Sequence, residues 1–257
     1  LQPKANIAIC GPDIRWVGNE GGKSRKSEYS VVPCALREAD RIMALSQQDE
    51  SQASSLQKYN QMDEDLGSRK ILEKNAYLCW FPAEVDVSIR KGWFFHDKDN
   101  RNSKSAKKLF KIYLNSVGNN CTLLLNIPPN AQGEIHKKDV KNLKKLGEKI
   151  KAITASPILY QELGELNKDN GVLDFTFDSD KKVNYVVLQE DITKSQRVEL
   201  FDLYIQKANG KFKRVYKGTV IGAKKIINLK GKKAKGIRLV IRQSRSNPVI
   251  KSVGIYE

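Results

Sequence analysis

The sequence has 257 residues, and 46 Lys and Arg against 29 Asp and Glu give it a formal net charge of +17. Its hydrophobic content of 40% is enough for a folded core, which argues against a disordered chain. No stretch approaches the roughly 20 consecutive apolar residues that a membrane-spanning helix needs. A chain of this length can form one large domain or two ordinary ones.

The positive charge raises the question of an anionic partner. Because the lysines are spread over predicted helices and turns, without a nucleic-acid-binding motif, we predict no nucleic-acid partner. A solvated basic surface, or attraction to an acidic glycan, is the preferred interpretation. The four cysteines have no C-x-x-C spacing and only two histidines accompany them, so we expect neither a zinc site nor a disulfide framework.

The N-terminal region combines an apolar run with a loop of unusual composition. Residues 5–10 predict a buried strand, and the loop of residues 11–22 carries four glycines, a proline, Arg15, Trp16 and two carboxylates, one of them Glu20. Aromatic and charged side chains in such a loop are typical of a functional site. The alternative is a surface loop in which Trp16 is buried and Arg15 pairs with one of the two carboxylates.

Residues 23–79 are polar and uneven, with a short helix predicted around Leu36, Ala39 and Met43. Within this region, residues 47–58 are rich in Gln, Ser, Asp and Glu, which predicts an exposed excursion.

From residue 84 onward the pattern alternates between strand and helix. We predict strands over 84–89 and 121–127, and amphipathic helices over 102–117 and 137–153. This order indicates a parallel α/β architecture. With the opening strand it supplies three barrel-type strands, too few to close an eight-stranded barrel of ~250 residues.

Past residue 156 short β-rich runs recur between turn residues, which predicts an antiparallel β-sandwich. We therefore divide the chain into an α/β domain, residues 1–155, and an all-β domain, residues 156–257. The predicted strands are 172–177, 183–189, 197–206, 212–216, 225–229, 237–243 and 249–256.

Three segments together resemble one known family. They are GPDIRWVGNE at 11–20, WFPAEVDVSIRKGWFFH at 80–96, and SVGNN at 116–120 continuing to LLLNIPP at 123–129. In this order they resemble the family 29 glycoside hydrolases, the retaining α-L-fucosidases. The resemblance implies that the chain is the later part of an irregular (β/α)8 TIM-like barrel followed by an antiparallel β-sandwich.

The resemblance also implies roles for individual residues. Glu20 matches the general acid/base of the subgroup that removes terminal α-1,3/1,4-linked fucose from glycans by double displacement, without a metal or organic cofactor. Arg15, Trp16, Glu84, Arg90 and Trp93 are the candidates for binding the fucosylated substrate. For Glu84 and Arg90 a buried ion pair beneath Trp93 is an equal alternative. For the sandwich, a supporting role is preferred to sugar binding.

The sequence also departs from the family pattern. None of its three tryptophans begins the Trp-x-Asp-Gly pattern of the family's nucleophile, and Lys91 stands where the family has a proline. We therefore expect the nucleophile in an upstream N-terminal half, which would be the partner of this chain, and no activity from the chain alone. The family's usual substrates imply a periplasmic or secreted location. The alternative function is a non-catalytic protein that binds fucosylated glycans.

Overall fold

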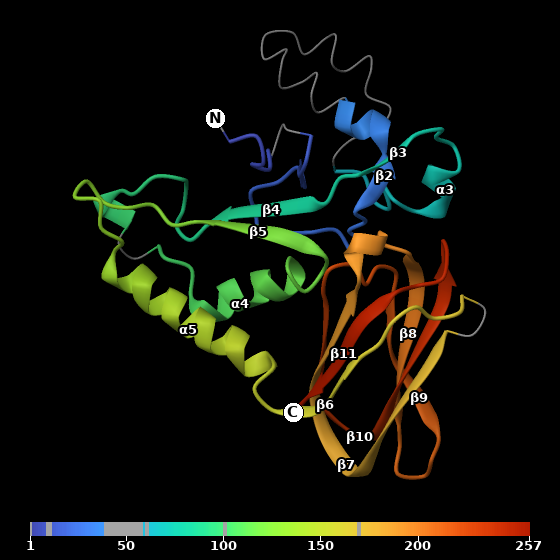
Figure 1. Cartoon of the computed structure of the whole chain (residues 1–257). Helices are drawn as coiled ribbons and strands as arrows, with labels where there is room; N and C mark the ends of the chain where they lie inside the picture. The colour runs from blue at the N-terminus through green and yellow to red at the C-terminus, as the bar shows by residue number, and fades with distance from the viewer. Residues whose placement is uncertain (1, 9–11, 39–58, 60–61, 100–101, 169–170) are drawn as a thin grey trace.

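Two parts with different secondary structure follow one another along the chain (Figure 1). The computed structural model describes residues 2–8, 12–38, 59, 62–99, 102–168 and 171–257. Parallel strands and helices make up the first part. Its last helix ends at Ile153, and the first strand of an antiparallel sheet begins at Pro157.

A three-stranded parallel sheet forms the centre of the first part. Its strands are β1 (Arg15–Trp16), β4 (Ala83–Ser88) and β5 (Cys121–Asn126), with β4 in the middle. Ser88 pairs with Asn126, so the carboxyl ends of β4 and β5 lie side by side. The strands predicted over 84–89 and 121–127 are thus confirmed to within one residue.

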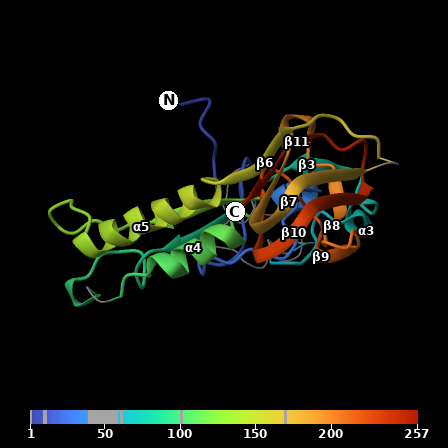
Figure 2. The same cartoon turned by 90° about the horizontal axis from the view of Figure 1, so that it is seen from below.

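The two faces of this sheet differ in chemistry because successive side chains of a strand point in opposite directions. Ala83, Val85 and Val87 of β4 are buried on one face, and Glu84, Asp86 and Ser88 occupy the other. Ile89 continues the apolar row and packs against Leu109 and Leu146 of the helices. Helices α4 (Ala106–Asn115) and α5 (Lys137–Ile153) lie together below the sheet (Figures 1 and 2).

Both helices start at identifiable caps. Helix α4 begins later than the predicted 102–117 because the Ser105 hydroxyl accepts a hydrogen bond from the Lys108 amide at 3.3 Å and fixes the first turn. Helix α5 has the predicted bounds, 137–153, and its first turn is capped by Nδ1 of His136, 3.2 Å from the Lys138 amide. A 3-10 turn, η1 (Asp97–Asp99), lies between β4 and α4.

The strand predicted over residues 5–10 is wrong where the structure describes it. Residues 5–8 are irregular, and the Ile7 side chain is exposed. The Ile7 amide donates to Oδ2 of Asp13 at 2.8 Å, and its carbonyl accepts from the amides of Asp13 and Ile14. These local bonds use the backbone amide and carbonyl that a strand would need for pairing with β4. Arg15 and Trp16 pair with β4 instead. Residues 9 and 10 lie outside the described residues.

A short ribbon and nearby helical turns extend from the parallel sheet. The ribbon pairs β2 (Val31–Pro33) with β3 (Leu78–Trp80), and α3 (Arg69–Leu72) lies beside it. Residues 34–38 are helical, in agreement with the helix predicted around Leu36. The positions predicted for Ala39 and Met43, and the excursion over 47–58, lie outside the described residues.

The second part is a six-stranded antiparallel sheet in the order β6-β11-β7-β10-β8-β9. Its strands are β6 (Pro157–Glu162), β7 (Val172–Glu190), β8 (Val198–Gln206), β9 (Phe212–Gly218), β10 (Lys225–Ser244) and β11 (Ile250–Tyr256). A 3-10 turn, η2 (Ile192–Lys194), joins β7 to β8.

Strands β7 and β10 are long enough to take part in two layers. The first half of β10 pairs with the second half of β7, and beyond a register shift at Ala234 and Gly236 it pairs with the start of β7 and with β8. Strands β11 and β6 complete one layer, and β9 completes the other. The fold class is therefore the later part of a (β/α) barrel followed by an antiparallel β-sandwich, as predicted.

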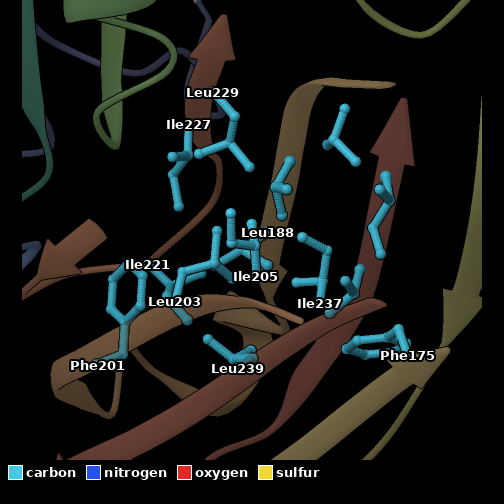
Figure 3. Packing of buried hydrophobic residues seen from close by; sticks show 14 of the residues in the cluster. Phe175, Leu188, Phe201, Leu203, Ile205, Ile221, Ile227, Leu229, Ile237 and Leu239 are labelled. Carbon is cyan, nitrogen blue, oxygen red and sulfur yellow. The ribbon is translucent and has the colours of Figure 1, made fainter. Parts of the chain in front are cut away.

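Apolar side chains from both layers meet inside the sandwich (Figure 3). Phe201, Leu203 and Ile205 project from β8, and Leu188 and Ile227 face them from the opposite layer. The predicted strands over 172–256 all lie in this sheet, but two pairs of them are joined into single long strands. The strands predicted over 172–177 and 183–189 form β7, and those over 225–229 and 237–243 form β10. Strand β6 was not predicted; it lies at the edge of the sheet and is half-exposed.

The free thiols among the described residues belong to Cys34, Cys79 and Cys121. Burial raises the pKa of Cys79 to about 12, and the hydrogen bond to Cys34 acts in the same direction. Among the helices described, none has the length and apolar character needed to cross a membrane. The described Cys, His, Asp and Glu side chains do not assemble into a group of three or more that could hold a metal ion.

Candidate active site

Polar side chains gather where β1, β4 and β5 end. Glu84, Asp86 and Ser88 point away from the helices, and the parallel register places Asn126 of β5 beside Ser88 on the same face. The loop after β1 returns along β4, because the Gly22 amide donates to the Asp86 carbonyl at 3.2 Å. Enzymes built on barrels keep their active sites at this edge of the sheet.

Glu20 and Trp93 lie in contact across this edge. The indole Nε1 of Trp93 donates to Oε2 of Glu20 at 2.7 Å, although 73 residues separate the two in the sequence. Glu20 is exposed, and Trp93 is half-buried. A carboxylate that is held by one donor and still reaches solvent can exchange a proton with a bound substrate.

Asn126 fixes the loop that carries Trp93. Its Nδ2 donates to the Trp93 carbonyl at 2.8 Å and to Oγ of Ser88 at 3.1 Å. The residue before Trp93, Gly92, has a φ of +83°, a conformation that favours glycine. Asn126 lies within the strand predicted over 121–127, and nothing in the sequence indicated its contact with Trp93.

Trp16 is bonded to a carboxylate on β4. Its Nε1 donates to Oδ1 of Asp86 at 2.8 Å. Burial raises the pKa of Asp86, and the negative charge of Glu20 adds to the shift, while the Trp16 bond opposes it. Burial also raises the pKa of Glu84, helped by Asp86. Oε1 of Glu84 has no hydrogen-bond partner among the described residues.

Arg15 lies in the protein interior. Only 1% of its surface is exposed, and its guanidinium donates to Oε2 of Glu28 and to the Tyr29 carbonyl, both at 2.9 Å. Burial pushes the pKa of Glu28 upward, but Arg15 and Arg25 outweigh it, so the net shift is downward. Arg15 does pair with a carboxylate, but its partner is Glu28 and not one of the two loop carboxylates considered from the sequence.

Arg90 is equally buried, and it does not pair with Glu84 as the alternative prediction had it. Its Nε donates to Oδ2 of Asp139 at 2.7 Å, and both side chains are fully enclosed. The guanidinium also lies 4.6 Å from the centre of the Phe95 ring. Asp139 was missed from the sequence because an acid in the first turn of a helix is already explained by its interaction with the helix dipole.

The structure therefore divides the predicted site residues into two groups. Glu20, Trp16 and Trp93 lie at the edge of the sheet where they can meet a ligand. Arg15, Glu84 and Arg90 are buried beneath them.

Comparison with known proteins points to one family. The family model described as alpha-L-fucosidase matches residues 10–153. The chain is 31% identical to Alpha-L-fucosidase 1 of Arabidopsis thaliana over 100% of its own length and 52% of the relative. It thus spans about half the length of the curated relatives that it matches.

Solved structures agree with this match. A protein assigned as an alpha-L-fucosidase in Bacteroides ovatus is 41% identical, with a TM-score of 0.85 over 100% of this chain and 43% of that one. A fucosidase of glycoside hydrolase family 29 from Ruminococcus gnavus, solved with fucose, has the same fold at 23% identity, with a TM-score of 0.72 over 95% of this chain and 50% of that one.

Proposed function

The chain belongs to the alpha-L-fucosidase family, and we propose that it forms the acid/base half of an exo-acting, retaining α-L-fucosidase that releases terminal α-1,3/1,4-linked fucose from glycans. The observation that carries the proposal is the pair of Glu20 and Trp93 at the ends of β1 and β4, within the segment that matches the family.

In the proposed mechanism Glu20 protonates the departing glycosidic oxygen and then removes a proton from water. The Trp93 indole holds the Glu20 side chain in place, because its Nε1 donates to Oε2 of Glu20 at 2.7 Å. Trp16 and Trp93 offer ring faces to the sugar. Arg15, Arg90 and Glu84 act from below, by fixing the strands that carry the site.

Retention of configuration requires a second carboxyl group roughly 5–5.5 Å from the first, which acts as the nucleophile. We propose that this group is an aspartate in an upstream portion of the polypeptide, whose strands pair with the edge strands β1 and β5 and close the barrel around the polar face of β4. The proposal is supported by the length of the relatives, of which the chain covers 52% and 48%. On this account the chain alone is inactive, and the complete protein is periplasmic or secreted.

The test compares fucose release from an α-1,3/1,4-fucosylated oligosaccharide by a polypeptide carrying both portions and by its Glu20→Gln variant. We expect the variant to lose roughly 10²- to 10⁴-fold in rate, the usual contribution of acid/base catalysis, and azide to restore part of it. Circular dichroism would establish that the fold is unchanged. Glu84→Gln serves as the matched control, because it makes the same Glu-to-Gln change at the other candidate glutamate.

Each other outcome has a definite meaning. Full turnover by Glu20→Gln, with a loss in Glu84→Gln, would move the acid/base role to Glu84. Fucose release by the chain alone would contradict the upstream nucleophile. Binding of the oligosaccharide without hydrolysis by any form of the protein would indicate a glycan-binding protein.

A further inference from the structure

A cavity of about 510 Å³ lies between the two parts of the chain, away from the Glu20 edge. Its walls come from residues 23–26, the end of α4, β9 and the start of β10. The end of α4 lies beside the sandwich there (Figures 1 and 2), and the Ile226 amide donates to the Gly118 carbonyl at 2.9 Å. The cavity adjoins the amino end of β5, whereas Glu20 and Trp93 lie near the carboxyl ends of the strands.

The charges that line this cavity all have the same sign. Lys23, Arg25, Lys26 and Lys225 contribute to the wall, and none of the described lining residues is Asp or Glu. Arg25 pairs with Glu28 at 3.0 Å, and Arg15 shares the same carboxylate. In the described part of the chain, neither Lys225 nor the exposed Lys23 and Lys26 forms an ion pair with a carboxylate. Three positive charges therefore border the cavity without a counter-charge.

The charge of Lys225 is the most unfavourable of the three, because only 5% of the surface of this residue is exposed to water. Its ammonium donates to Oδ1 of Asn119 and lies 5.8 Å from the centre of the Tyr216 ring. An ammonium has three donors, and a buried charge without a counter-ion is unfavourable. Burial lowers the pKa of Lys225 to about 8, so the group still carries its proton at pH 7.

The hydrogen bonds of Asn119 keep its oxygen turned toward this ammonium. Its Nδ2 donates to Oγ of Ser24 at 2.9 Å and to the Arg25 carbonyl at 2.6 Å. The same amide thus ties the loop of residues 23–26 to the ammonium of β10. The arrangement is built from side chains of both parts of the chain and is not a chance cluster of surface lysines.

We propose that this cavity binds a sulfate-type oxyanion, with Lys225 as the buried partner and Lys23 and Lys26 at the mouth. The oxyanion can be a free inorganic ion or the sulfate ester of a glycan, since both offer the same charged oxygens. The volume lies within the range of 300–1,000 Å³ typical of small-ligand sites, which leaves room for a sugar that bears the group.

The test is isothermal titration calorimetry of the full chain with sodium sulfate, at an ionic strength held constant with sodium chloride. Lys225→Met removes the buried charge. Lys233→Met, at an exposed position of the same strand, removes one charge elsewhere and controls for attraction to the net positive protein. We expect saturable one-site binding, weakened at least tenfold in Lys225→Met and unchanged in Lys233→Met.

A second pair of variants keeps the test decisive if Lys225→Met does not fold. The double variant Lys23→Met/Lys26→Met changes only exposed positions, and Lys232→Met/Lys233→Met is its control. Weaker sulfate binding in Lys23→Met/Lys26→Met, with unchanged binding in Lys232→Met/Lys233→Met, supports the proposed oxyanion site. Equal effects in both, or no saturable binding in the unmodified chain, would overturn the proposal.

A titration with N-acetylglucosamine 6-sulfate identifies the source of the oxyanion. Tighter binding than that of inorganic sulfate supports a sulfated glycan as the ligand, and equal binding supports the free ion. Because the oxyanion site does not depend on Glu20, a negative result in these titrations would not contradict the proposed fucosidase activity.

Discussion

Arg90 and Asp139 carry opposite charges in a position that water does not reach, 2.7 Å apart and fully enclosed. Removal of Asp139 takes the oppositely charged partner away from a fully buried guanidinium, and breaking a buried ion pair in this way typically costs about 3–5 kcal/mol. We expect Asp139→Leu to lower the free energy of unfolding by an amount of this order in urea titrations. The double variant Arg90→Met/Asp139→Leu should recover most of the loss. A double variant no better than the single one would show that the pair acts through packing.

Trp93 and Glu20 permit a second prediction at the scale of single residues. Trp93→Phe keeps an aromatic face but removes the donor that lies 2.7 Å from the carboxylate. A hydrogen bond to a charged group contributes about 1.5–3 kcal/mol, so the rate of fucose release by the complete protein should fall roughly tenfold or more. Trp93→Ala should cost more, since it also removes the ring. An unchanged rate of fucose release in Trp93→Phe would show that the indole does not position Glu20.

Glu84 should make stability fall as the pH rises. Burial and the neighbouring Asp86 raise its folded-state pKa above the unfolded value, so the folded state binds the proton more tightly. The stability contributed by the protonated group is fully present below the unfolded pKa and is lost as the pH rises through the folded pKa. We expect Glu84→Gln to flatten this decline above pH 4 in urea titrations, and an equal slope in both proteins would contradict it.

At the scale of elements, Gly222 joins the sandwich to the barrel part. Its φ is +60°, and a Cβ there would lie 2.1 Å from Oδ1 of Asn120, the acceptor for the Ala223 amide. The Gly222 amide itself donates a hydrogen bond to Oε2 of the buried Glu190 at 2.7 Å. We expect Gly222→Ala to destabilise the chain by more than the roughly 1–3 kcal/mol of backbone strain alone.

The matched control for this substitution is Gly210→Ala, since Gly210 has a φ of +79° with open space around it. The control measures the backbone cost, and the difference between the two variants in thermal or urea unfolding measures the clash with Asn120. Equal losses would show that the loop yields without disturbing Asn120.

Elements with a strong repeating pattern were predictable from the sequence. Helix α5 has both a hydrophobic stripe and a capping residue, and β4 and β5 alternate or run apolar between clear breaks. Residues 5–8 were mispredicted because an apolar composition does not reveal that Asp13 binds the Ile7 backbone. The continuity of β7 and β10 was hidden because the polar residues at their bends resemble turns.

The candidate site was predictable only where a motif carried it. Glu20 and Trp93 were found as separate residues, and their contact depends on loops that the sequence pattern does not place. The partners of Arg15 and Arg90 were missed because Glu28 lies in an irregular loop and Asp139 on helix α5, and periodicity does not show which distant residues meet. Lys225 resembled any other lysine until the fold enclosed it.

At the scale of the whole molecule, the two parts are joined by polar contacts from several elements. Glu199 of β8 pairs with Arg69, the Arg245 guanidinium donates to the Gly67 carbonyl, and Gln196 accepts from the Ser30 amide at 3.3 Å. Apolar side chains also pack across the boundary, since Val220 lies in a cluster with Val32 and Phe81, and Val187 in one with Ile153, so separation of the parts would expose apolar surface to water. We therefore expect the chain to unfold as one cooperative unit.

The distribution of tryptophan makes this expectation testable with one probe. Trp16, Trp80 and Trp93 all precede the sandwich, so tryptophan fluorescence reports only on the first part. Leu203 is fully buried in the sandwich core, and Leu203→Ala should destabilise that part by about 2–5 kcal/mol. If the chain unfolds as one unit, Leu203→Ala should lower the urea midpoint measured by tryptophan fluorescence and should also lower the protection of the β8 amides against hydrogen exchange. A midpoint that stays in place while β8 loses its protection would mean that the parts unfold independently, and that the contacts between them do not transmit stability.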